Sequence, residues 1–278
     1  MADFGGAYYP LSERETKKFR KIILDNLVKS ASVELAESDE YDGIGRLSEK
    51  QMHSALKSFI CSDESKHEIK IQGSPLYIPS DAENTKNRKY VADVLDGDTI
   101  YEIQTGGFSP LRDKIKWILE NTAYRVVVIH PIAETKWIRK IDENGKISPK
   151  RKSNKHGRVQ DIANELYFFK DFLTSPRFSL MILMMEAEQY VKPQKRGRRL
   201  QKYEMIPVSL LGAYLFKNAA DYAWFLPDTL PDTFTVKDYS SHAKIYGMDA
   251  YSITKTLCDI GLIEECGTIG RARAYRKK

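Results

Sequence analysis

The 278-residue sequence has few cysteines and no long apolar run. Its three cysteines, Cys61, Cys258 and Cys266, fit neither a disulfide framework nor a zinc knuckle. No segment approaches the roughly 18 consecutive apolar residues of a membrane-spanning helix. The first ten residues, MADFGGAYYP, also lack the apolar run of a signal peptide. We therefore expect a soluble, intracellular (cytoplasmic) protein that has no membrane partner.

The composition is that of a globular protein with a moderate excess of positive charge. Hydrophobic residues make up 42% of the chain and charged residues 29%, which is enough to bury a sizeable core. The formal net charge is +6 and the pI is near 8.9. This excess favours a polyanionic partner, although the clustering of the charges carries more information than their sum.

Residues 90–108, YVADVLDGDTIYEIQTGGF, have the pattern of a β-hairpin. The Asp-Gly step between two alternating apolar segments predicts a tight turn. Asp93 falls on the first strand, and Glu102 and Gln104 share one face of the second because side chains alternate along a strand. Such a layout suits a divalent metal ion. A Glu-x-Gln tripeptide is also common on the solvated face of an edge strand, so its surroundings must decide.

Patterned segments surround the hairpin. Residues 46–61 predict a helix capped by Ser48, with Glu49, His53 and Lys57 in a polar stripe that is either solvated or borders a site. Residues 109–121 predict a second helix, and residues 125–131 a buried strand. The expected fold class is therefore α/β, with a mixed central sheet flanked by helices.

The order of these elements, with Asp93 on one strand and Glu102-Ile103-Gln104 on the next, resembles the PD-(D/E)xK nuclease superfamily. The stretch ADVLDGDTIYEIQTGGF is most similar to the variant in CoiA-like competence-associated nucleases, in which glutamine replaces the usual lysine. The similarity covers about residues 47–141 and implies a restriction-endonuclease-like fold. It also implies that Asp93 and Glu102 bind a metal ion with the backbone carbonyl of Ile103, that Gln104 occupies the lysine position, and that Glu49 is a further catalytic residue.

The implied chemistry is hydrolysis of phosphodiester bonds with Mg²⁺ or Mn²⁺. Magnesium binds through one or two carboxylates, waters and substrate phosphate, and it activates the attacking water. Gln104 departs from the family pattern, because an amide orients water but provides neither a base nor a positive charge. A neighbouring lysine must then supply the charge, and the candidates are Lys57, Lys114 and Lys116.

Two basic loops follow in the middle of the chain. The first lies in residues 148–158, before a predicted helix at residues 159–173. The second joins the two arms of a predicted hairpin, residues 178–190 and 203–211. Each loop is either a solvated tip or a set of phosphate contacts, and a nuclease-like fold favours the latter. The predicted DNA contacts in this half of the chain are Lys57, Lys114, Arg151, Lys152, Lys195, Arg196, Arg198 and Arg199.

The C-terminal sequence predicts helices at residues 218–225, 236–245 and 250–260, capped by Asn218, Thr235 and Asp249, and then a hairpin. The order helix, tight turn, helix, hairpin resembles a winged helix-turn-helix domain. That fold places its second helix in the major groove, although winged helices also bind proteins. The predicted DNA contacts are Tyr251, Ser252, Thr254 and Lys255 on the helix, with Arg271, Arg273 and Arg276 in the wing.

Together these features predict a helical accessory segment (residues 1–46), a nuclease-like domain (47–216) and a winged-helix domain (217–278). We expect a metal-dependent DNA endonuclease. The alternatives are a catalytically inactive DNA-binding regulator or assembly subunit on the same fold, and a subunit whose activity requires another chain. The sequence leaves open whether the substrate is DNA or RNA and whether the chain forms a homodimer.

Overall fold

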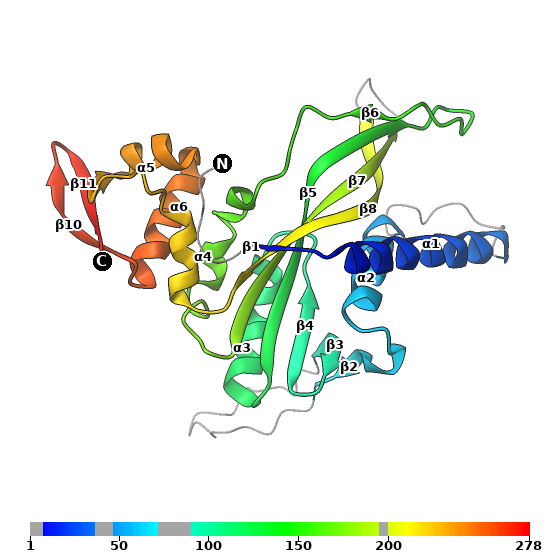
Figure 1. The fold of residues 1–278 in the computed structure, drawn as a ribbon, viewed down its shortest axis with the longest axis horizontal. Coiled ribbons are helices and arrows are strands. Elements are labelled where there is room, and N and C mark those ends of the chain that lie inside the picture. The colour runs from blue at the N-terminus through cyan, green and yellow to red at the C-terminus, as the bar shows by residue number, and fades with distance from the viewer. Residues whose placement is uncertain (1–7, 37–46, 72–89, 195–199) are drawn as a thin grey trace.

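The computed structural model describes residues 8–36, 47–71, 90–194 and 200–278. Over this part of the chain the main sheet has eight strands, in the order β1-β8-β7-β5-β4-β3-β2, with β6 paired to β5 (Figure 1). The strands are β1 (Tyr8–Pro10), β2 (His67–Lys70), β3 (Val91–Asp96), β4 (Thr99–Ile103), β5 (Arg125–Lys140), β6 (Arg151–Lys152), β7 (Phe178–Pro193) and β8 (Leu200–Phe216).

The sheet is mixed, as the sequence predicted. β4 pairs with β5 and β5 with β7 in parallel, whereas β2, β3 and β4 form an antiparallel meander and β8 pairs antiparallel with β7 and β1. The parallel pair β4–β5 requires a crossover, which α3 (Arg112–Asn121) provides. The predicted hairpins β3–β4 and β7–β8 are both present, and a positive φ of 61° at Gly97 makes the turn of the first.

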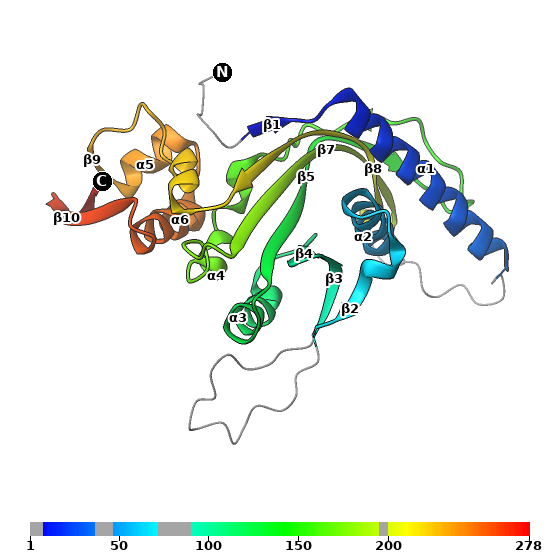
Figure 2. The same cartoon turned by 60° about the horizontal axis from the view of Figure 1, so that its bottom comes forward.

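Helices cover both faces of this sheet (Figure 2). α1 (Glu13–Ala36) and α2 (Leu47–Ile60) bury Phe19, Met52 and Leu56 against Ile103 and Leu183 of the strands. On the opposite face α3 and α4 (Leu166–Phe169) pack into the larger core, which continues into the C-terminal region. The chain is thus an α/β protein whose mixed central sheet is flanked by helices. No helix within the described ranges is long and apolar enough to cross a membrane.

The C-terminal region has a small sheet of its own, in the order β10-β11-β9. Its elements are a 3₁₀ segment (Ala219–Phe225), β9 (Thr233–Thr235), α5 (Val236–Ala243), α6 (Gly247–Asp259), β10 (Ile263–Ile269) and β11 (Ala272–Lys277). Asn218 and Thr235 are caps, as predicted. The cap assigned to Asp249 was wrong: α6 begins two residues earlier, and this carboxylate lies in the first turn, where it still complements the helix N-terminus.

Three further helix predictions need correction. α2 includes Leu47, so Ser48 lies inside this helix and does not precede it. Residues 109–111 form a 3₁₀ turn before α3 begins. Residues 159–173 are not one helix but a 3₁₀ turn (Val159–Ile162) followed by the short α4. The apolar side chains at these positions are nevertheless buried, because three- and four-residue spacings place residues on one side in both helix types.

Candidate active site

The predicted carboxylates meet where β3 and β4 separate. The two strands pair from Asp96–Thr99 to Val94–Tyr101, a register that places Asp93 opposite Glu102. At that point a side chain replaces the backbone partner: the Ile103 N–H donates to Asp93 Oδ2 at 2.7 Å. The sequence therefore placed both acidic residues correctly on adjacent strands.

Asp93 is held in its ionised form. The His53 Nε2 atom lies 2.9 Å from Asp93 Oδ2, although this ring nitrogen is not aligned to donate a hydrogen bond. Burial favours the neutral acid, but His53 and the Ile103 N–H outweigh it and hold the pKa of Asp93 below its ordinary value. Asp93 is thus an anion with most of its surface removed from water.

Glu102 has the opposite character. Only 2% of the residue is exposed, and burial raises the pKa of Glu102 to about 7 in spite of the neighbouring Lys114 ammonium. Lys114 Nζ, from α3, lies 2.5 Å from Glu102 Oε2 and also donates to the Val91 carbonyl at 2.6 Å. The second oxygen, Glu102 Oε1, is buried without a hydrogen-bond partner. A buried carboxylate oxygen of this kind is ready to accept a proton, a donor or a cation.

Gln104 is engaged by its own loop. Its side-chain amide donates to the Gly107 carbonyl, and its backbone N–H donates to the Ile129 carbonyl at 2.8 Å. Its backbone carbonyl accepts from His130 Nδ1 at 2.6 Å, because a carbonyl has no proton to give. Ile103 buries its side chain in the α1–α2 core. Only the backbone of Ile103 is therefore available to a ligand.

The lysines proposed to assist the carboxylates separate into three environments. Lys114 contacts Glu102, Lys57 forms an ion pair with Glu68, and Lys116 lies 3.9 Å from Glu120 on its own helix. The side chain of Glu49 is outside the described residues. His53 was not predicted as a site residue, although its spacing of four from Glu49 and Lys57 could have indicated it.

A metal ion would find few protein ligands here. In the described ranges, no three His, Cys, Asp or Glu side chains converge closely enough to hold an ion. Asp93 and Glu102 provide two carboxylates, and the unpartnered Oε1 atom provides one oxygen free of competing donors. This set fits Mg²⁺ or Mn²⁺, since magnesium commonly keeps several waters and binds to one or two carboxylates.

The predicted nucleic-acid contacts on the helix are only partly exposed. Tyr251 and Lys255 are exposed on α6, and Lys255 lies 3.4 Å from Asp259. Thr254 was expected at the surface but is fully buried, with its hydroxyl donating to the Ala250 carbonyl at 2.7 Å. Ser252 donates to Asn164 at 2.8 Å. α6 packs against α4 and α5, and the sequence of α6 alone did not reveal which of its polar residues would be covered.

The arginines of the β10–β11 hairpin are exposed, and two of the three are paired with carboxylates. Arg273 lies 3.3 Å from Glu265, and Arg276 donates through Nε to Glu264 at 3.0 Å. Arg271 has no ion pair with another described residue and lies at the turn between β10 and β11. Of the basic loops, Arg151 and Lys152 are exposed on β6. Lys195, Arg196, Arg198 and Arg199 lie outside the described residues.

A family comparison covers the site. The model of a family described as a domain of unknown function (DUF8091) matches residues 75–215. The chain belongs to this family. The DUF8091 segment contains Asp93, Glu102 and Lys114 and ends just before the C-terminal region. A protein of Treponema pallidum (strain Nichols), described as uncharacterized, is 27% identical over 235 residues, which are 83% of this chain and 86% of that protein. No solved structure matches the chain.

Proposed function

We propose that this DUF8091 protein is a metal-dependent nuclease that hydrolyses phosphodiester bonds at Asp93 and Glu102. One observation carries the proposal: Glu102, almost fully buried, keeps an oxygen without a partner on the strand next to an ionised Asp93. An unpartnered buried carboxylate oxygen is costly for a purely structural residue. A bound cation would remove that cost.

The arrangement of elements supports the proposed relationship to PD-(D/E)xK nucleases. The resemblance predicts helix, strand, hairpin, helix and buried strand, and the described order is α2, β2, β3–β4, α3 and β5. Asp93 lies on the first strand of the hairpin and Glu102 on the second, as in the proposed motif. Fold likeness of this kind raises the expectation of a nuclease, but the site residues must carry the function.

The residues present fit Mg²⁺ or Mn²⁺. Asp93, Glu102 and the Ile103 backbone would hold the ion, which when bound polarises the scissile phosphate and activates a water molecule. Lys114 can replace the lysine that is absent at position 104. Its ammonium group lies beside Glu102 and can offer the positive charge that the Gln104 amide lacks. His53 keeps Asp93 ionised, as a metal ligand must be.

The C-terminal region would hold the nucleic acid as a winged helix-turn-helix unit. α5 and α6 are joined by a short turn and followed by the β10–β11 hairpin, which is the element order of that fold. Tyr251 and Lys255 on the exposed side of α6 and Arg271 at the hairpin turn are the side chains available to a duplex.

The test is cleavage of plasmid, linear duplex and single-stranded DNA and of RNA, in Mg²⁺ or Mn²⁺ against EDTA. Asp93→Asn and Glu102→Gln should each slow cleavage by at least about 100-fold, since metal-assisted charge stabilisation is worth several kcal/mol. Asp96→Asn is the matched control, because it removes an exposed carboxylate from the same strand. Equal cleavage by the Asp93 and Glu102 variants and the wild-type protein would exclude this site.

A second candidate is a nucleic-acid-binding regulator without catalysis. The engagement of Gln104 with its own loop and of Glu102 with Lys114 favours it, since both leave less of the site open to a substrate. Absence of metal-dependent cleavage in every substrate, together with salt-dependent binding of DNA, would select this function.

A further inference from the structure

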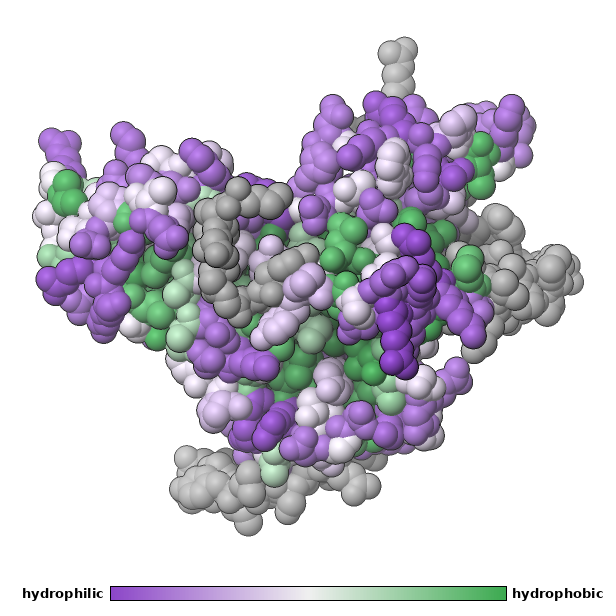
Figure 3. All heavy atoms as spheres, in the orientation of Figure 1, coloured by the Kyte–Doolittle hydropathy of each residue, from purple (hydrophilic) through white to green (hydrophobic). Residues whose placement is uncertain are grey.

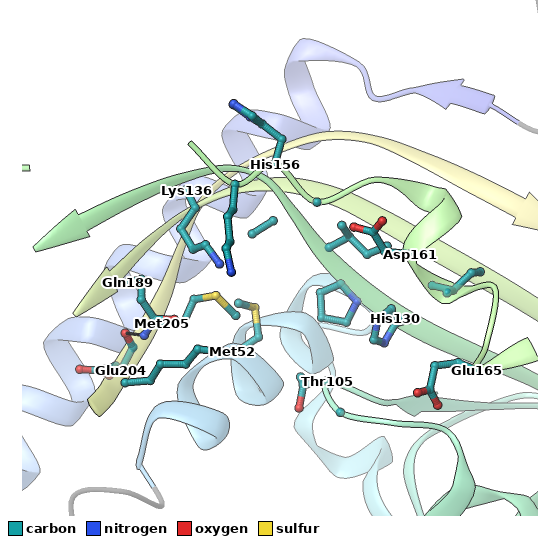
Figure 4. Close-up of a pocket in the computed structure, with 18 of the residues that line it drawn as sticks. Met52, Thr105, His130, Lys136, His156, Asp161, Glu165, Gln189, Glu204 and Met205 are labelled. Carbon is teal, nitrogen blue, oxygen red and sulfur yellow. Dashed lines mark hydrogen bonds between the residues drawn. The ribbon is translucent and has the colours of Figure 1, made fainter. Parts of the chain in front are cut away.

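A cavity of about 890 Å³ (Figure 4) is lined in part by sequence neighbours of the candidate active-site residues, although Asp93 and Glu102 do not line it themselves. Its lining includes Met52, which precedes His53, and Thr105 and Gly106, which follow Gln104. From there the cavity extends along β5 towards the far ends of β7 and β8. The proposed catalytic residues and the cavity are therefore contiguous along the chain.

Three lysines from separate segments line the distal part of the cavity: Lys136 on β5, Lys155 after β6 and Lys202 on β8. Burial lowers the pKa of Lys136, and the positive charges of Lys202 and Lys155 lower it further. No carboxylate of the described chain lies within ion-pair distance of these three ammonium groups. Uncompensated like charges at one site are unfavourable unless an anion binds between them.

The wall that carries Lys155 is firmly attached to β5. The Ser153 N–H donates to the Lys136 carbonyl at 2.8 Å and the Gly157 N–H to the Ala133 carbonyl at 3.0 Å. A Cβ atom at Gly157 would lie 2.5 Å from Ile132 Cγ2, so the close approach depends on glycine. The backbone that carries Lys155 is thus fixed against β5, whereas the side chains of Lys155 and Lys202 reach the surface.

The cavity also has three acidic residues, and each of them already has a partner. Asp161 pairs with Arg158 at 3.3 Å, and Glu165 accepts from the Phe108 N–H at 2.6 Å. Both lie away from Lys136, whereas Glu204 lies near Gln189 on the lysine side (Figure 4). The three lysines outnumber this one carboxylate. Hydrophilic residues also cover the outer surface at this end of the long strands (Figure 3).

The remaining lining combines apolar and polar side chains. Met52 and Met205 face the middle of the cavity (Figure 4), and Pro131 and Ile132 add to the same surface. A volume of this order holds a ligand of drug size, roughly one or two nucleotides. Phosphate oxygens suit the lysines, and a sugar and base suit the apolar part.

We propose that this cavity binds the phosphate groups of a single-stranded nucleic acid, and that Lys136, Lys155 and Lys202 hold the strand whose neighbouring phosphodiester bond reaches Asp93 and Glu102. The inference rests on the proposed function, whose substrate class it narrows to single strands or strand ends. Its binding step requires no metal ion and no cleavage.

The test is a fluorescence-anisotropy titration of the full chain with a labelled single-stranded oligodeoxynucleotide in EDTA at several salt concentrations. Lys136→Met and Lys202→Met should each weaken binding about tenfold. Each should also reduce the salt slope, the slope of log affinity against log salt concentration, by about 0.7, the value for one phosphate contact on a single strand. Lys140→Met is the matched control: it removes an exposed lysine from the same strand, β5, outside the cavity. Slopes equal to that of the wild-type protein in both variants would overturn the proposal.

Two further titrations distinguish a single strand from the other possible ligands of the cavity, a duplex and a mononucleotide. A blunt duplex should lose little affinity in the cavity variants, and a nucleoside monophosphate should compete only weakly with the strand. Competition by the monophosphate as strong as by the oligonucleotide would overturn the assignment to a strand. Thermal unfolding shows whether Lys136→Met remains folded, and Lys202, being exposed, provides an independent variant. Because the experiment measures binding and not cleavage, its result can be interpreted even if the protein is not a nuclease.

Discussion

Two ion pairs show how differently the two halves of the molecule use charge. In the candidate active site, the Lys114 and Glu102 side chains are only 16% and 3% exposed. In the C-terminal region, the Arg276 and Glu264 side chains are 58% and 36% exposed. Both pairs bring a cation and a carboxylate into contact, but water screens only the second.

This difference in burial determines what each pair can do. The exposed pair costs little to form or to break, so Arg276 and Glu264 can separate readily. The buried pair cannot be exchanged cheaply, because removal of Lys114 leaves the Glu102 carboxylate without water or a cation, whereas Lys114 also has the Val91 carbonyl as a partner. The surroundings of Glu102 are thus fixed in advance, whereas the ion pair on the β10–β11 hairpin can open and close.

The largest difference between the two regions should follow from Lys114→Met. At about pH 8 the variant should lose about 3 kcal/mol of unfolding free energy, since breaking a buried pair costs about 3–5 kcal/mol. At about pH 5 the loss should be smaller, because the buried Glu102 takes up a proton instead. Urea denaturation at the two pH values measures both. A loss that is the same at both pH values would show that Lys114 acts through packing alone.

Arg276→Ala is the matched change in the exposed pair. It should leave the urea midpoint unchanged at either pH, because Glu264 stays in contact with water. A clear loss of stability in this variant would contradict the comparison between the two regions.

Glu102→Gln should remove a pH dependence of the unfolding free energy that is similar in size to the effect of Lys114→Met. Burial raises the pKa of Glu102 from 4.5 to about 7, so the folded protein binds this proton more tightly than the unfolded chain. The resulting stability is fully present below about pH 4.5 and is lost as the pH rises to about 7. At about pH 8, in EDTA, the variant should therefore be more stable than the wild-type protein by up to about 3 kcal/mol. Parallel stability profiles of the two proteins across this range would contradict a raised pKa.

The sequence was sufficient to locate the two carboxylates on facing strands, but not to identify the lysine that contacts Glu102. The turn at Gly97 and the alternation of side chains fix the register, and the register places Asp93 opposite Glu102. The choice among Lys57, Lys114 and Lys116 depends on how each helix is rotated against the sheet. That rotation is set by packing across the core, to which distant segments contribute.

Long-range packing also explains the other residues that were missed or misplaced. His130 stands in a continuous apolar run whose pattern predicts a buried strand but not a polar contact with Gln104. Thr254 is polar yet fully buried on α6, a helix that packs against both α4 and α5. Lys136, Lys155 and Lys202 are far apart in the sequence and come together only in the folded chain.

A smaller effect is expected from Arg271 in the wing. Arg271→Ala should weaken binding of duplex DNA a few-fold and reduce the salt slope by about 0.9, as one phosphate contact does on B-form DNA. Arg276→Ala should weaken it less, because Arg276 already shares its charge with Glu264. Anisotropy titrations at several salt concentrations compare the two. A larger loss from Arg276→Ala would show that the ion pair opens for the nucleic acid.

The smallest effects should distinguish the two sides of α6. Thr254→Val exchanges a buried hydroxyl, bonded to the Ala250 carbonyl, for a methyl group of similar volume. It should change the unfolding free energy by under about 1 kcal/mol and leave DNA affinity unchanged, since Thr254 is not exposed. Tyr251→Ala should lower DNA affinity and leave the urea midpoint unchanged, because this side chain is 58% exposed. If Tyr251→Ala binds DNA like the wild-type protein, the exposed side of α6 does not contact the duplex.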